Sequence, residues 1–147
     1  MTLRFYIDDS GKNDPPVFVL GGAALASERV AAFEQAWNKV LAAAPAVPYF
    51  KMTEAKACRG AFQGMPPKER DAKVAALGLV LREHAVATLS VVVRHEDYDR
   101  VYADKMMRWM DRPYQMMFHL AIATAFKLCR EQNLGESAEF VRPPARS

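Results

Sequence analysis

Two adjacent acidic residues near the start of the chain, Asp8 and Asp9, are the first candidates for chemistry. They follow an apolar, β-rich run at residues 3–7 and therefore stand at the end of a predicted strand. A strand end holds side chains at the rim of a sheet, where ligands bind in α/β folds. Carboxylate oxygens are the ligands that Mg²⁺ and Mn²⁺ prefer. The opening strand therefore predicts a site for a divalent cation, and the alternative is a solvated hairpin loop.

Strand alternation separates these two acids. It places Asp8 on the face of Tyr6, and Asp9 on the face of Phe5 and Ile7. We therefore expect only one of the two carboxylates to point at any given site.

A second candidate is Glu54, which lies between Lys51 and Lys56. A carboxylate flanked by two lysines can be a metal ligand beside cations that bind phosphate, and the alternative is a solvated surface. A third acidic group follows a later strand, at residues 94–99. Its acids can add a ligand, but we interpret them as the acidic first turn of a helix, which the helix dipole favours.

The elements that must position these residues can be predicted from turn signals and hydrophobic spacing. Strands at residues 3–7 and 17–20, joined by a polar loop, predict an antiparallel hairpin. A helix follows from Ser27 and ends before Pro45. Residues 48–52 are predicted as a short strand or an extended segment, and the stretch to residue 65 as a loop.

The second half of the chain contains more helix. Helices are predicted at residues 66–84, 96–110 and 113–135, and a strand at residues 138–141. The apolar, β-branched run at residues 87–93 predicts a central strand that is covered on both faces. This order of elements predicts an α/β fold with a mixed sheet and helices packed on it.

Composition is that of one globular domain. The 147 residues are 51% apolar and 25% charged, which excludes a disordered chain, and the net charge of +3 forms no basic stripe. Cys58 and Cys129 are far apart and are expected to be reduced thiols. No stretch is long enough to span a membrane and the N-terminus has no signal core, so we expect a cytoplasmic protein.

The opening residues Tyr-Ile-Asp-Asp-Ser-Gly, followed by Phe-Val-Leu-Gly-Gly-Ala-Ala-Leu, resemble the family called domain of unknown function 3800. Its hallmark is a first strand that ends in Asp-Glu-Ser-Gly and a second, apolar strand with Gly-Gly. The likeness covers residues 3–141 and continues through Tyr49-Phe50-Lys51, Arg59-Gly60-Ala61-Phe62, Glu69-Arg70 and the run from Val91 to Tyr98.

The resemblance implies a ribonuclease H-like fold and a metal-dependent nuclease that uses Mg²⁺ or Mn²⁺. Asp8 matches the first-strand acid of the family, Asp9 replaces its Glu, and Glu54 is aligned with the next polar motif. Asp8 and Glu54 would then be catalytic, and Asp8, Asp9 and Glu54 would hold the metal. Ser10, Lys51 and Lys56 would contact the nucleic acid.

The chain departs from the family pattern at its end. Family members carry an Asp after the strand that corresponds to residues 138–141, and a further acid later, but Arg142 stands at the first of these positions. We therefore expect one domain at residues 1–141 that is incomplete at its C-terminus, followed by a tail at residues 142–147.

Two functions follow from this. The first is hydrolysis of phosphodiester bonds in nucleic acid. The second is a catalytically incomplete domain that acts as a binding or assembly module, in which the strand at residues 138–141 is an unprotected edge that favours a homodimer.

Overall fold

The computed structural model describes residues 2–10, 16–102, 113–131, 133–134 and 137–141. Contacts within the chain divide it into two compact units. The first unit comprises Met1–Ser27 and Val86–Ser147, and the second comprises Glu28–Ala85. Each unit has its own core, and each is described by itself below.

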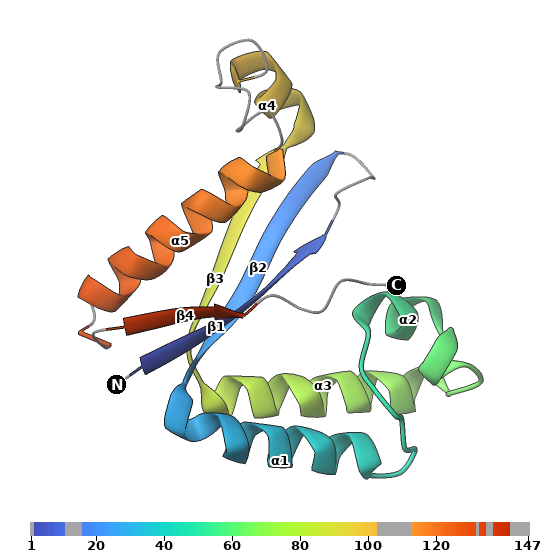
Figure 1. The fold of residues 1–147 in the computed structure, drawn as a ribbon. Helices are drawn as coiled ribbons and strands as arrows, with labels where there is room; N and C mark the ends of the chain where they lie inside the picture. The colour runs from blue at the N-terminus through green and yellow to red at the C-terminus, as the bar shows by residue number, and fades with distance from the viewer. Residues whose placement is uncertain (1, 11–15, 103–112, 132, 135–136, 142–147) are drawn as a thin grey trace. The chain divides into compact units, whose positions relative to one another are not determined.

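The sheet has four strands in the order β3-β2-β1-β4 (Figure 1). The strands are β1 (Thr2–Ser10), β2 (Val17–Ala26), β3 (Ala85–Arg94) and β4 (Ser137–Val141). Strand β1 runs antiparallel to β2 and parallel to β4, so the sheet is mixed. The predicted α/β class, the mixed sheet and the opening hairpin are therefore confirmed.

Alternation along β1 builds the core of the first unit. Leu3, Phe5 and Ile7 are buried, whereas Arg4 and Tyr6 between them are partly exposed. Period-2 alternation of this kind is what a strand with one covered face requires. The covering element is helix α5 (Pro113–Glu131), which lies along the sheet in Figure 1.

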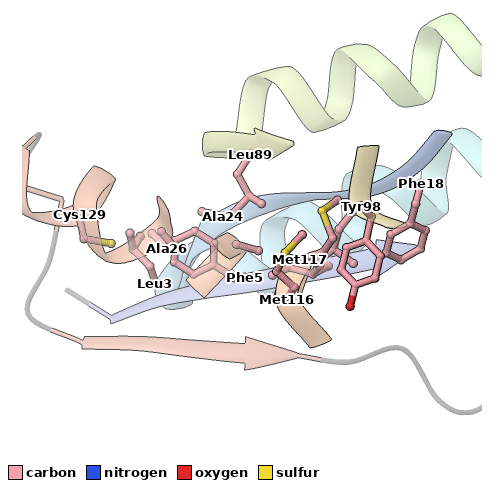
Figure 2. Packing of buried hydrophobic residues seen from close by; sticks show 14 residues of the cluster. Leu3, Phe5, Phe18, Ala24, Ala26, Leu89, Tyr98, Met116, Met117 and Cys129 are labelled. Atoms are coloured by element: carbon pink, nitrogen blue, oxygen red, sulfur yellow. The ribbon is translucent and has the colours of Figure 1, made fainter. Parts of the chain in front are cut away.

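The core of the first unit joins β1, β2 and one face of α5. Figure 2 shows these side chains meeting in one cluster. Met117, Ala121 and Ala125 of α5 are fully buried, and their spacing of four residues places them on one helix face. The small alanines let α5 come close to the aromatic and branched residues of the strands.

A close backbone approach explains one of the paired glycines of β2. A Cβ atom at Gly22 would clash with the carbonyl oxygen of Tyr6 and would lie 3.0 Å from the Ile7 side chain. At Gly21 the nearest atom to such a Cβ is the carbonyl oxygen of Leu89, at 3.9 Å, which is ordinary contact. The β1–β2 pairing therefore needs a glycine at position 22.

The prediction of a central strand at residues 87–93 is wrong. Strand β3 lies at one end of the described sheet and pairs with β2 alone. Leu89 is buried, but Thr88, Ser90, Val92 and Arg94 are exposed, so only one face is covered. An apolar run shows that a strand is favourable there, but it does not fix the order of strands in the sheet. At the other end, β4 is the predicted edge strand in the part of the chain that the structure describes.

The second unit is helical. Helices α1 (Val30–Ala42) and α3 (Pro67–His84) pack side by side (Figure 1). Proline at the start of α3 needs no hydrogen bond from its nitrogen, which explains the predicted helix start. The core of this unit consists of Leu41, Val47, Ala55, Phe62 and Leu77, with further aromatic residues around it.

The segment between α1 and α3 differs from the prediction. Residues 48–51 do not form a strand, and the expected loop contains helix α2 (Met52–Ala57) and a 3-10 turn (Gly60–Phe62). Ala55 and Phe62 anchor these two elements in the core. Helix α2 is only six residues long, and a hydrophobic period gives little signal over so short a length.

The third acidic group takes the form that we favoured. Helix α4 (His95–Tyr102) follows β3 directly and has Glu96 and Asp97 in its first turn. The rest of the helix predicted at residues 96–110 lies outside the described residues. None of the described helices is both long and apolar enough to cross a membrane.

Candidate functional site

The Asp8–Asp9 pair lies on β1, where its Cα atoms face Gly21 and Leu20 of β2. Asp8 is exposed and Asp9 is partly buried. Alternation places Asp8 on the face of Arg4 and Tyr6, opposite the core. The backbone N–H of Asp9 donates a hydrogen bond of 2.9 Å to Oδ1 of Asp8. Asp8 is therefore the acid of this pair that β1 presents to solvent.

Parallel pairing of β1 with β4 brings an ion pair, Arg4 with Glu139, to the face of the sheet that carries Asp8. Nε of Arg4 donates a hydrogen bond of 2.9 Å to Oε2 of Glu139. This bond, with the attraction between the two charges, raises the pKa of the Arg4 guanidinium above its usual value. The last pair of the register is Tyr6 with Val141, two residues before Asp8. The carboxyl ends of β1 and β4 therefore point toward the same edge of the sheet.

Ser10 and Arg142 are two further positions that the sequence singles out. Ser10 ends β1 with its Cα opposite Val19, and its side chain is not among the described ones. Arg142, which stands where family members have an acid, lies outside the described residues.

Glu54 lies at the centre of a network of contacts in the second unit. Its Oε2 accepts hydrogen bonds from the hydroxyl of Tyr49, at 2.9 Å, and from the backbone N–H of Ala61, at 3.3 Å. Its Oε1 lies 3.2 Å from Nζ of Lys51. The pKa of the Glu54 carboxyl is lowered, first by the Tyr49 hydrogen bond and then by Lys51 and the Ala61 N–H.

The same contact acts on Tyr49. Its hydroxyl donates to the Glu54 carboxylate, and losing that proton would place two negative charges side by side. The pKa of Tyr49 is therefore raised above 10.0. Both pKa shifts favour a charged Glu54 carboxylate as acceptor and a neutral Tyr49 hydroxyl as donor at neutral pH.

Gly60 makes the approach of Glu54 to the 3-10 turn possible. Its φ of +55° lies in the left-handed region that glycine adopts readily. A Cβ atom at this position would clash with Oε2 of Glu54. The Arg59-Gly60-Ala61 sequence therefore closes the turn on the Glu54 carboxylate.

These contacts give Glu54 a structural role: it joins Tyr49, α2 and the 3-10 turn. Lys51 is 45% exposed beside it, and Lys56 is exposed on α2. Catalysis or metal binding by Glu54 stays a prediction.

The predicted site residues fall into two groups. Asp8, Asp9 and Ser10 belong to the first compact unit, and Lys51, Glu54 and Lys56 belong to the second. Within the described residues, no three His, Cys, Asp or Glu side chains gather as metal ligands would. The exposed carboxylate of Asp8 fits a hydrated Mg²⁺ site, because this ion keeps several waters and takes only one or two carboxylates plus substrate phosphate.

Three residues with notable contacts were missed in the sequence. Lys73 is buried, and its Nζ donates to the carbonyl oxygens of Val40, at 2.6 Å, and Ala43, at 2.7 Å. Lys73 lies four residues before Leu77, and this helical spacing could have indicated that Lys73 is on the buried face of α3. Arg70 donates to Sγ of Cys58 at 3.1 Å, and nothing in their spacing indicated that pair.

Comparisons with models of known protein families, with curated protein sequences and with solved structures find no match to this chain. Membership of the domain of unknown function 3800 family, which the opening motif indicates, therefore stays a prediction.

Proposed function

We propose that this chain is a ribonuclease H-like, metal-dependent nuclease that hydrolyses phosphodiester bonds of nucleic acid. The strand order supports the fold, because such sheets place a parallel strand beside β1 on the side away from the opening hairpin. Asp8 carries the function, because it is exposed near the carboxyl end of β1, which the parallel strand β4 flanks. Ligands of α/β sheets bind at such carboxyl ends.

In this proposal Asp8 is the principal ligand of a Mg²⁺ or Mn²⁺ ion. Metal binding by Asp9 and by Glu54, which the resemblance implies, stays a separate prediction, because Asp9 lies on the other face of β1 and Glu54 belongs to the other unit. The bound ion would supply an activated water and stabilise charge on the oxygens of the phosphate. Lys51 and Lys56 contribute positive charge to the phosphates of the substrate, and Ser10 contributes a hydroxyl that can hydrogen-bond to them.

Calorimetric titration with Mn²⁺ tests this proposal. We expect saturable binding to the wild-type chain and its loss in Asp8→Asn, which keeps the size of the side chain and removes its charge. Asp99→Asn is the matched control, because Asp99 is exposed in the same unit, on α4. Equal Mn²⁺ binding by wild type and Asp8→Asn would contradict the metal site.

A second candidate is a binding or assembly module that forms a homodimer. The edge position of the short strand β4 favours it, because edge strands present unpaired backbone groups to other chains. Absence of Mn²⁺ binding in both proteins, together with a dimer in sedimentation experiments, would favour this candidate over the nuclease.

A further inference from the structure

The net positive charge of the protein lies in one of its two units. The helical unit, Glu28–Ala85, has nine basic and six acidic residues, whereas the unit with the sheet has eleven of each. The helical unit therefore carries the whole formal charge of +3. A surplus confined to 58 consecutive residues gives a stronger local potential than the same charge spread over the chain.

Within this unit, the carboxylate of Glu54 on α2 is already paired with a lysine. Residues 49–61, which we call the Glu54 loop, contain one acidic residue and three basic ones. Glu54 pairs with Lys51 at 3.2 Å. Lys56 and Arg59 are both exposed, and no acidic residue of the loop is left to balance them. Neither side chain forms an ion pair with any acid that the structure describes, so the Glu54 loop presents two positive charges to solvent.

The Glu54 loop also exposes two large apolar side chains. Tyr49 is 46% exposed and Met52 is 55% exposed. The Tyr49 hydroxyl is fixed by its 2.9 Å hydrogen bond to Glu54, so its ring is held at the surface in one orientation. An exposed aromatic ring that is already ordered loses little entropy when a planar group stacks on it.

The backbone of the loop is ordered as well. Ala55 and the adjoining Phe62 anchor it in the core, and the N–H of Arg59 donates to the carbonyl oxygen of Glu54 at 3.0 Å. Glu54 thus links the ring of Tyr49 with the backbone that carries Arg59. The aromatic ring and the cations are therefore carried by one ordered stretch of backbone.

We infer that the Glu54 loop binds a single-stranded polynucleotide: a base stacks on Tyr49, and the phosphates contact Lys56 and Arg59. Ordered aromatic rings beside backbone-tracking cations are the means by which proteins hold single strands. A duplex keeps its bases stacked on one another and does not offer a free base to Tyr49. The choice of a nucleic acid rests on the proposed function, whereas the choice of a single strand rests on the Glu54 loop.

Fluorescence anisotropy with a labelled oligothymidylate of about 12 nucleotides, in EDTA, tests the charge contribution. The double variant Lys56→Gln/Arg59→Gln should bind about tenfold more weakly and reduce the slope of log K against log salt by about 1.4. The control Lys39→Gln/Arg82→Gln removes two exposed cations of the same unit from α1 and α3. We expect the control to change the affinity by less than about twofold, from the general field alone.

Two substitutions of Tyr49 test the stacking. Tyr49→Leu removes the aromatic face and should weaken binding roughly tenfold, because stacking on one base is worth about that much. Tyr49→Phe keeps the face and loses only the bond to Glu54, so most of the affinity should remain. The same oligonucleotide in a duplex should bind more weakly than the single strand.

Three results would overturn the inference. The first is an equal loss of affinity in the two double variants, which would mean a response to net charge alone. The second is equal binding of duplex and single strand, and the third is competition by polyglutamate as strong as by unlabelled oligonucleotide. Because EDTA removes divalent ions, failure of the metal site leaves this binding intact. Conversely, if the Glu54 loop does not bind the oligonucleotide, the binding of Mn²⁺ at Asp8 is unaffected.

Discussion

The two compact units of this protein are stabilised by different kinds of contact. In the unit with the sheet, alternating apolar residues of β1 and β2 pack on the buried face of α5. In the helical unit a smaller apolar core is supplemented by Lys73 and Glu54, which bind backbone groups of other segments. The stability of the first unit therefore depends mainly on apolar packing, whereas that of the second also depends on specific charged side chains. Substitutions that change charge without changing volume should accordingly damage the helical unit more.

Lys73→Met gives the largest effect expected from this difference. It keeps the length of the side chain but leaves the carbonyl oxygens of Val40 and Ala43, at the end of α1, without their buried ammonium donor. Hydrogen bonds to charged groups contribute about 1.5–3 kcal/mol each, so we expect a loss of about 3 kcal/mol in the free energy of unfolding. Urea unfolding followed by circular dichroism measures it.

Lys68→Met is the control for this prediction, because Lys68 is exposed on the same helix. We expect a change within about 0.5 kcal/mol for this variant. Equal unfolding midpoints for Lys73→Met and Lys68→Met would show that the ammonium of Lys73 does not hold the end of α1.

Gly22→Ala is the corresponding test of shape in the unit with the sheet. The added methyl group meets the carbonyl oxygen of Tyr6, a backbone atom that cannot move without breaking the β1–β2 register. Overpacking of this kind costs about 1–3 kcal/mol. Gly21→Ala adds the same group in ordinary contact, 3.9 Å from the Leu89 carbonyl oxygen, and should be neutral or slightly stabilising. If both variants unfold at the same urea concentration, the close approach at Gly22 does not limit the pairing.

The sequence predicts elements of the first unit but not the order of its strands, for a physical reason. Period-2 alternation in β1 and the four-residue spacing in α5 are local signals, and both elements form as predicted. The edge position of β3 depends on which strands pair across the chain, and an apolar run at residues 87–93 contains no information about that.

The candidate site shows the same limit. Alternation in β1 is enough to predict which of Asp8 and Asp9 is more exposed. The environment of Glu54 depends on Tyr49 and on a turn closed by Gly60, so no pattern around Lys51 and Lys56 could reveal that the carboxylate is already bound by its own loop. Side chains that bind distant backbone groups, such as Lys73, are hardest to foresee because only the fold creates their partners.

The smallest expected effect is the pH dependence that Glu54 gives to the helical unit. Its carboxyl has a lower pKa in the folded chain than the ordinary 4.5, so the charged form is the one that folding favours. Its contribution to the free energy of unfolding is therefore complete above about pH 4.5 and is lost as the pH falls through the lower, folded pKa. Urea unfolding of wild type and Glu54→Gln between pH 3 and pH 7 should give two curves that converge on the acid side.

The two partners of Glu54 separate the causes of this shift. The hydrogen bond from Tyr49 is the largest single cause of the lowered pKa of Glu54, ahead of the hydrogen bond from Lys51. Tyr49→Phe should therefore raise the Glu54 pKa further toward 4.5 than Lys51→Met, as read from an NMR titration of the side-chain carboxyl. The opposite order would mean that the ammonium of Lys51 is the main partner. The hydrogen bond to Glu54 would then hold the Tyr49 ring less firmly, and Tyr49→Phe would change the order of the ring little.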